Sequence, residues 1–231
     1  MPSVTYTTIN PSYQGAIIGD SATTWDGARG ATDGTAYNYT TSAEANAAVF
    51  INYENIKGSN YWTINRSYLY FDVSSISGTV DSVILKIAGA GQYTSADIIV
   101  VASTAFNGAS NALIGTDFDN VSFSTPYSSE VTTWNVNSYN NISLNSTARS
   151  AIESSSVFKV AIIEHDFDYS DVSTTTTPRS GIWFADGTYP IELYVGYVPG
   201  GYGNNINGIA AADIADVVGI DTADISLVNG V

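Results

Sequence analysis

The sequence predicts an all-β protein: a β-sandwich or jelly roll with one short helix, followed by a short repetitive C-terminal tail. Two observations predict this class. Apolar and polar residues alternate with period two in short segments, and these segments are bounded by Gly, Asn, Ser or Pro. The 16 tyrosines outnumber the 7 lysines and arginines, which suits strands better than helices. With 231 residues and 44% hydrophobic content, the chain is long enough for one sandwich with a real core.

The clearest predicted strand covers residues 66–73. Its alternation places Leu69, Phe71 and Val73 on one face and the residues between them on the other. A Ser- and Gly-rich turn follows, and residues 80–88 alternate again. We therefore expect these two segments to be neighbouring strands of one sheet.

Other short segments also have strand character, and one segment has helical character. The further strands are expected at residues 4–9, 47–53, 97–102, 131–136, 158–164, 181–185 and 191–197. Asn145 is placed to cap a helix over residues 146–153. Residues 19–43 are read as a long loop with weak strand content, and residues 168–179 as an exposed loop.

The C-terminal part differs from the rest in composition. We expect the sandwich to cover residues 1–198, a Gly-rich linker to cover residues 199–205 and a tail to cover residues 206–231. The tail repeats with an eleven-residue period, in which Gly-Ile, Ala-Asp-Ile and Val recur. Its apolar set is too small to form a core and is predicted to dock on a partner or on sister copies. That set is Ile209, Ile214, Val217, Ile220, Ile225 and Val228. A degenerate linker, or a tail folded back on its own domain, is the alternative.

Charge excludes some classes of partner. The 22 acidic and 7 basic residues give a net charge of −15, and the basic residues are scattered singly. Nucleic acid and anionic membrane surfaces are therefore disfavoured as partners. No stretch approaches the length of a transmembrane helix. The absence of Cys excludes thiol catalysis and thiolate metal sites. The first residues do not read as a signal peptide, which would fit a virion component assembled inside its host. An unconventional secretion route, or a sequence given without its signal, would look the same.

One segment resembles a known family. Residues 66–87, Arg-Ser-Tyr-Leu-Tyr-Phe-Asp-Val followed by a Ser/Gly turn and a second strand, resemble the signature of DNRLRE-type domains. That β-sandwich family includes carbohydrate-binding modules. Residues 190–197 are similar to its closing strand, and residues 131–135 to its Thr-Trp-Asn stretch. The family's metal-binding and sugar-binding residues do not align and are not carried over. The tail repeats look like those that end structural proteins of environmental tailed phages.

Catalytic chemistry has little support in the sequence. His165 is the only histidine, so a Ser–His–acid triad would have to use it, and no Gly-x-Ser-x-Gly nucleophile elbow exists. A glycoside hydrolase needs two carboxylates across a cleft, and the sequence cannot pair them. We therefore expect a protein that is not an enzyme.

Two acidic groups could supply oxygen ligands for a structural calcium ion. Asp166, Asp168 and Asp171 follow one predicted strand, and Asp117 and Asp119 form a second group. Neither matches the EF-hand spacing, and exposed turn aspartates are the alternative. No other cofactor is indicated.

Glycan binding needs flat aromatic side chains beside polar ones. Trp62, Tyr61 and Trp25 are the candidates, and core burial is the alternative for each tryptophan. Trp183, between Ile182 and Phe184, reads as core or half-core.

The function expected first is a non-enzymatic structural, decoration or fibre-type protein of a particle such as a phage virion, located on the virion or on an extracellular particle surface. The tail would attach it to other virion or surface proteins, or to sister subunits. The second expectation is a carbohydrate-binding module for adhesion or receptor contact. An acidic polysaccharide hydrolase is a distant third.

Overall fold

The structure is a computed structural model that describes residues 4–40, 43–184, 187–199, 216–217 and 220–221. Most of the described residues lie in antiparallel strands. The strands are β1 (Thr5–Ile9), β2 (Tyr13–Gly19), β3 (Gly34–Asn38), β4 (Ala43–Ile56), β5 (Ser59–Asp72), β6 (Gly78–Thr94), β7 (Ile98–Ser103), β8 (Val121–Pro126), β9 (Tyr139–Ser143), β10 (Val157–Glu164), β11 (Arg179–Phe184), β12 (Glu192–Pro199), β13 (Asp216–Val217) and β14 (Ile220–Asp221). The helices are α1 (Trp25–Arg29), α2 (Ser146–Glu153), and the short turns η1 (Ala109–Asn111), η2 (Gly115–Asp117) and η3 (His165–Tyr169).

The strands form a sandwich whose two sheets share one long strand. β6 pairs with β12 and β9 along its first part, and with β11 along residues 89–94. The strand path therefore runs without a break in the order β1-β12-β6-β11-β4-β5-β10-β7-β8, with β2 and β3 attached through β5. The all-β sandwich predicted from the sequence is confirmed.

The core lies in two layers on opposite faces of β5. One layer fills the space between the sheets and includes Leu69, Phe71 and Val73, the three residues that the alternation places together. Tyr68 and Tyr70 point the other way, toward a second layer beneath α1 and the loop around Phe118. Both faces of β5 are thus covered, so this strand is central to the fold.

The helix at residues 146–153 is confirmed as α2. The Asn145 side chain accepts hydrogen bonds from the backbone N–H groups of Thr147 and Ala148, at 2.9 and 3.1 Å. A second helix, α1, lies inside the segment read as a long loop. Thr24 caps it by accepting from the Gly27 N–H at 3.1 Å. The fold therefore has two short α-helices rather than one.

Most predicted strands are present, but residues 131–136 do not form one. There, Val131 and Val136 each make only a single bridge, to Ile98 and Gly89. Trp134 between them is buried, and its indole N–H donates to the Gly181 carbonyl at 2.9 Å. The β-branched and aromatic residues of this segment thus pack in the core instead of pairing with a neighbouring strand.

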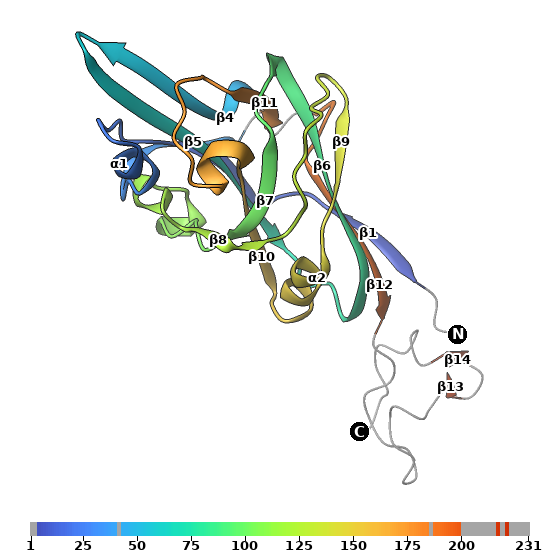
Figure 1. Cartoon of the computed structure of the whole chain (residues 1–231). Helices are drawn as coiled ribbons and strands as arrows, with labels where there is room; N and C mark the ends of the chain where they lie inside the picture. Colours follow the sequence, from blue (N-terminus) through green and yellow to red (C-terminus); the bar gives the residue numbers. More distant parts are fainter. Residues whose placement is uncertain (1–3, 41–42, 185–186, 200–215, 218–219, 222–231) are drawn as a thin grey trace.

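The sandwich has two distinct ends (Figure 1). β1 and β12 pair in antiparallel fashion from Thr5↔Tyr197 to Ile9↔Leu193, so the first and last strands reach the same end of the molecule. The β4–β5 hairpin projects at the opposite end, where Lys57 and Gly58 form its tip. We call these the terminal end and the hairpin end.

The tail prediction lies almost entirely outside the described residues. Ile209, Ile214, Ile225 and Val228 are not among them. Val217 and Ile220 pair in the two-residue ladder of β13 and β14. The linker at residues 199–205 is described only at Pro199.

Candidate functional site

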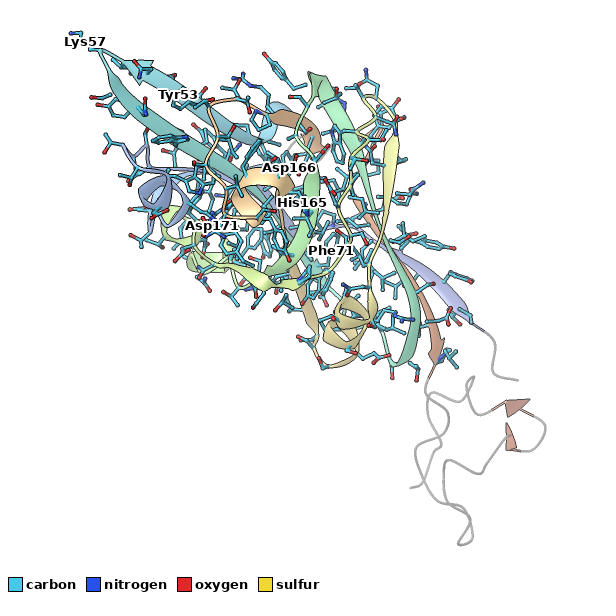
Figure 2. All side chains as sticks on the ribbon, in the orientation of Figure 1. Tyr53, Lys57, Phe71, His165, Asp166 and Asp171 are labelled. Atoms are coloured by element: carbon cyan, nitrogen blue, oxygen red, sulfur yellow. The ribbon has the colours of Figure 1, made fainter. Side chains whose placement is uncertain are left out.

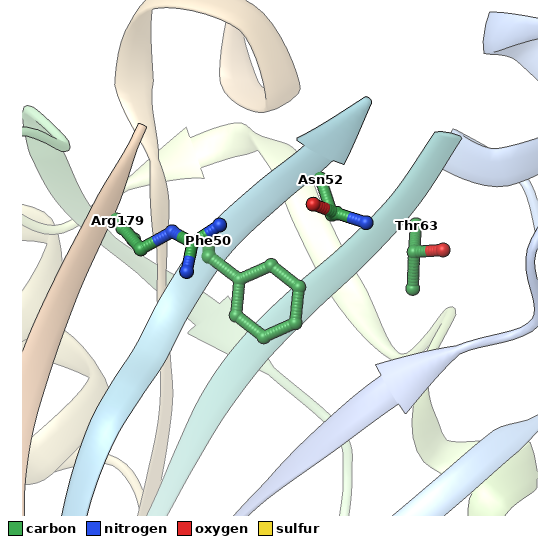
Figure 3. Close-up of a pocket in the computed structure, with 4 residues that line it drawn as sticks. All are labelled: Phe50, Asn52, Thr63 and Arg179. Carbon is green, nitrogen blue, oxygen red and sulfur yellow. The ribbon is translucent and has the colours of Figure 1, made fainter. Parts of the chain in front are cut away.

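A pocket with mixed polar and aromatic walls lies where β4, β5 and β11 run side by side (Figure 3). Phe50 and Asn52 come from β4, Thr63 from β5 and Arg179 from β11, and its volume is about 230 Å³. The register explains the grouping, because Phe50 lies opposite Arg179 and Asn52 lies opposite Thr63. All four side chains are half-buried, so the pocket is reachable from solvent.

Arg179 gives the pocket a positive charge. Its guanidinium carbon lies 5.1 Å from the centre of the Tyr93 ring, and Tyr93 is 40% exposed. Among the described residues, no carboxylate lies within ion-pair distance of Arg179. Aromatic contact holds a guanidinium in place while its N–H donors stay available.

The opposite end of the pocket is rich in oxygen and amide groups. The Asn52 side-chain amide donates to Glu54 at 2.9 Å, and the Thr63 hydroxyl donates to Ser21 at 3.0 Å. These bonds orient Asn52 and Thr63 and leave the Asn52 carbonyl oxygen facing the pocket region as an acceptor. The pocket thus combines the guanidinium of Arg179, the ring of Phe50 and the polar side chains of Asn52 and Thr63 on three neighbouring strands.

The tryptophans expected to bind glycans are not exposed platforms. Trp62 is 8% exposed and its indole N–H donates to the Thr174 carbonyl at 2.7 Å. Trp25 is also 8% exposed and donates to Asp171 at 3.1 Å. Both pack in the second core layer, Trp25 from α1 and Trp62 from β5, so the prediction of exposed rings at these two positions is wrong. Tyr61 is half-exposed and shares the Thr63 face of β5, next to the pocket.

The first acidic group is not gathered around one point. Asp168 is fully buried and both its oxygens accept from Arg66, from Nε and Nη2 at 2.8 Å each. Asp171 instead lies 3.5 Å from the Arg29 guanidinium. Asp168 is thus fully buried against a cation, and among the described residues it does not gather with Asp166 and Asp171 into one group of ligands, so the structure does not support the calcium prediction for it.

Arg66 is the centre of this buried network. Its remaining donors bond the Phe118 carbonyl at 3.0 Å and the Arg29 carbonyl at 2.9 Å, and its guanidinium lies 4.1 Å from the Phe118 ring centre. Burial disfavours the charged guanidinium, but the Asp168 carboxylate outweighs it, and the pKa of Arg66 is raised. Arg66 and Asp168 therefore attach α1, the loop at Phe118 and η3 to the sheet.

The second acidic group is divided in the same way. Asp117 is fully buried and accepts from the backbone N–H groups of Phe106, Asn107 and Ile114 at 3.0 to 3.2 Å. Asn107 and Asn120 also donate to it through their side-chain amides. Asp119 instead lines a separate surface pocket beside β7 and β8. Asp117 organises a loop, and the structure does not support the calcium prediction for it either.

His165 and Asp166 belong to a different group, labelled in Figure 2. His165 Nδ1 lies 3.1 Å from an Asp166 oxygen and 3.3 Å from a Glu130 oxygen. One ligand atom from each of the three lies within 4.8 Å of the others, so they could reach one metal ion. Partial burial, together with the charges of Asp166 and Glu130, raises the pKa of Asp97 beside them. Both acidic members are exposed, and such groups are common without a metal, so we assign none here.

Glu164 has the most perturbed carboxyl group of the described residues. It precedes η3 and accepts from the backbone N–H groups of Asp166, Phe167 and Asp168 at 2.7 to 3.2 Å. Burial raises its pKa to about 7, against the opposing effect of these three bonds. The carboxylate oxygens of Glu164 thus hold the backbone of the turn that begins η3.

Sequence reasoning missed Phe50 and Arg179. The sequence predicts only that Phe50 lies in a strand over residues 47–53 and that the basic residues, Arg179 among them, are scattered singly. No local motif joins them, because residues 50 and 179 meet only through the pairing of β4 with β11.

No protein-family model matches the chain, and no curated protein matches it. The resemblance to DNRLRE-type domains therefore stays a prediction. Among the described residues, no helix is long and apolar enough to cross a bilayer.

Proposed function

We propose that the protein is a non-enzymatic structural or decoration protein of a particle such as a virion. It is held at its terminal end and displays its hairpin end. The observation that supports this most is the separation of the two ends. β1 and β12 bring the chain to one end, and the pocket and the β4–β5 hairpin lie toward the other.

The arrangement of charged groups supports a structural role. Arg66, Asp168 and Asp117 are fully buried and bond backbone or one another rather than a cleft. The sole histidine lies between two exposed carboxylates, and no serine or threonine hydroxyl is bonded to its ring among the described residues. A general base needs such a nucleophile within hydrogen-bond reach.

Deletion of residues 204–231 tests the attachment. The expected result is loss of incorporation into particles, or a fall in oligomer mass in solution, with the circular dichroism spectrum of the sandwich unchanged. A Lys57→Gln variant at the hairpin end is the matched control and should assemble normally. Unchanged assembly after the deletion would refute the anchoring role.

A carbohydrate-binding role in adhesion is the second candidate, and the pocket at Phe50 and Arg179 favours it. An aromatic ring beside amide, hydroxyl and guanidinium groups is the usual composition of a polar-ligand site. A glycan array with the full chain tests this role. Binding to no glycan would remove it and leave the structural role standing.

A further inference from the structure

We propose that the pocket formed by Phe50, Asn52, Thr63 and Arg179 binds one carboxylated sugar residue, a uronic acid, of an acidic glycan. This inference rests on the carbohydrate-binding role proposed above and is independent of the attachment through the tail.

Arg179 supplies the charge that selects an acid. The chain has 7 basic residues, and most of their side chains have an ion pair or a hydrogen bond within the protein. Arg29 and Arg66 pair with Asp168, Lys86 pairs with Glu192, and Arg149 and Lys159 donate to backbone carbonyls. The guanidinium of Arg179 and the ammonium of Lys57 make no ion pair or hydrogen bond with a described residue, although the Arg179 backbone bonds the Ser95 hydroxyl. Lys57 lies at the exposed tip of the hairpin, whereas Arg179 lines a pocket.

A guanidinium in such a place favours a carboxylate ligand. Its planar fork of N–H donors matches the two oxygens of a carboxylate in bidentate geometry. In a protein with a net charge of −15, most of the surface repels anions. Binding of an acid therefore needs a local cation that no internal carboxylate neutralises, and Arg179 is in that position.

Phe50 supplies the surface that selects a ring. Its side chain lies between those of Arg179 and Thr63 among the residues that line the pocket (Figure 3). The C–H face of a pyranose is flat and apolar, and it packs well on an aromatic ring. A ligand whose ring covers Phe50 can place its carboxylate against Arg179.

Asn52 and Thr63 supply hydroxyl contacts away from the cation. The hydrogen bond from Asn52 to Glu54 orients the amide, and the side-chain oxygens of Asn52 and Thr63 can still accept from sugar hydroxyls. Glu54 would repel the carboxylate, but it lies four residues from Phe50, about 13 Å along an extended strand. The ligand is therefore oriented with its acid toward Arg179 and its hydroxyl groups toward Asn52.

The size of the pocket limits the ligand to one residue. Its volume of about 230 Å³ lies below the roughly 300 to 1,000 Å³ of sites for drug-sized ligands. Because the lining side chains are half-exposed, the neighbouring residues of a polymer can leave the site on both sides.

Titration of the full chain with methyl glucuronide and with methyl glucoside, followed by amide NMR shifts, tests the inference. The expected result is millimolar binding of the glucuronide, with shifts at the residues of the pocket, and about tenfold weaker binding of the glucoside. Arg179→Gln should weaken glucuronide binding by about tenfold and leave glucoside binding unchanged. Phe50→Leu should weaken both, because it keeps an apolar side chain and removes the flat ring.

Lys57→Gln is the matched control, since it also removes one positive charge, at the tip of the β4–β5 hairpin and outside the pocket. It should bind like the parent protein. Equal weakening by Lys57→Gln and Arg179→Gln would refute a defined site, as would equal binding of the two sugars or no shift at about 10 mM of either. The tail deletion separates this from the anchoring role, because a truncated chain should still bind the glucuronide.

Discussion

Replacing Asp168 by Asn should remove a large part of the stability of the sandwich. The change keeps the size of the side chain and removes the charge that faces Arg66. Two hydrogen bonds of 2.8 Å join this pair, and both side chains are fully buried. The guanidinium would stay in a dry site without its counter-charge.

Breaking one partner of a buried ion pair typically costs about 3 to 5 kcal/mol. Single domains have total stabilities of about 5 to 15 kcal/mol, so the variant should lose roughly a fifth or more of its free energy of unfolding. For a domain of this size, each kcal/mol lowers Tm by about 2 to 4 °C. We therefore expect Asp168→Asn to melt about 10 °C below the parent protein, measured by calorimetry and by urea unfolding.

Asp171→Asn is the matched control. Asp171 faces Arg29 at 3.5 Å, but its side chain is 58% exposed, and exposed ion pairs contribute under about 1 kcal/mol. Its φ of 55° is one that Asn tolerates, so the backbone should not be disturbed. Equal losses of stability in the two variants would refute the claim that burial makes the Arg66–Asp168 pair special.

Three further changes test other parts of the fold. Because burial raises the pKa of Glu164 to about 7, its protonated form favours the folded state. Stability relative to Glu164→Gln should therefore be highest below about pH 4.5 and fall by on the order of 2 kcal/mol as the pH rises through 7 in urea titrations. A difference in unfolding free energy between the two proteins that does not change with pH would refute this expectation. Asn145→Ala removes the α2 cap and should cost about 1 kcal/mol in chemical unfolding, whereas Ser155→Ala, outside the helix, should cost less. Asp117→Ala leaves three backbone N–H groups without their acceptor and should speed hydrogen exchange at Phe106 and Ile114 specifically. Unchanged exchange there would contradict its role.

The sequence predicts those strands in which apolar residues alternate with polar ones because every second residue is buried in the core. It misses the strands without that alternation. Residues 69, 71 and 73 alternate because they fill the space between the sheets. β2 contains Gly15, and a side chain there would collide with the Tyr37 carbonyl oxygen, so the close pairing of β2 with β3 needs a residue that reads as a loop former. β9 buries Asn140 and Ile142 and exposes the residues between and after them, but one of the two inward residues is polar, so the sequence shows no alternation of apolar and polar residues there.

The site was less predictable, for a different physical reason. Asp166, Asp168 and Asp171 are neighbours in sequence, but they lie in different surroundings. Asp166 is exposed beside His165, Asp168 is buried against Arg66 and Arg29, and Asp171 faces Arg29 from the exposed side. Burial of Trp25 and Trp62 depends on the formation of α1, and the Gly- and Thr-rich composition of that segment does not predict a helix. Phe50 and Arg179 are brought together by strand pairing across 129 positions, and a single sequence holds no local trace of that pairing.

The pairing of β1 with β12 also determines how the molecule resists mechanical force. Tension applied between Thr5 and Pro199 would pull the two neighbouring strands apart from one end, and their hydrogen bonds would break one after another. Tension applied between Pro199 and a ligand on the β4–β5 hairpin would instead run along β12, β6 and β11, and many bonds would bear the load together. A molecule that is attached only through β12 therefore resists force best when a ligand pulls on the hairpin end.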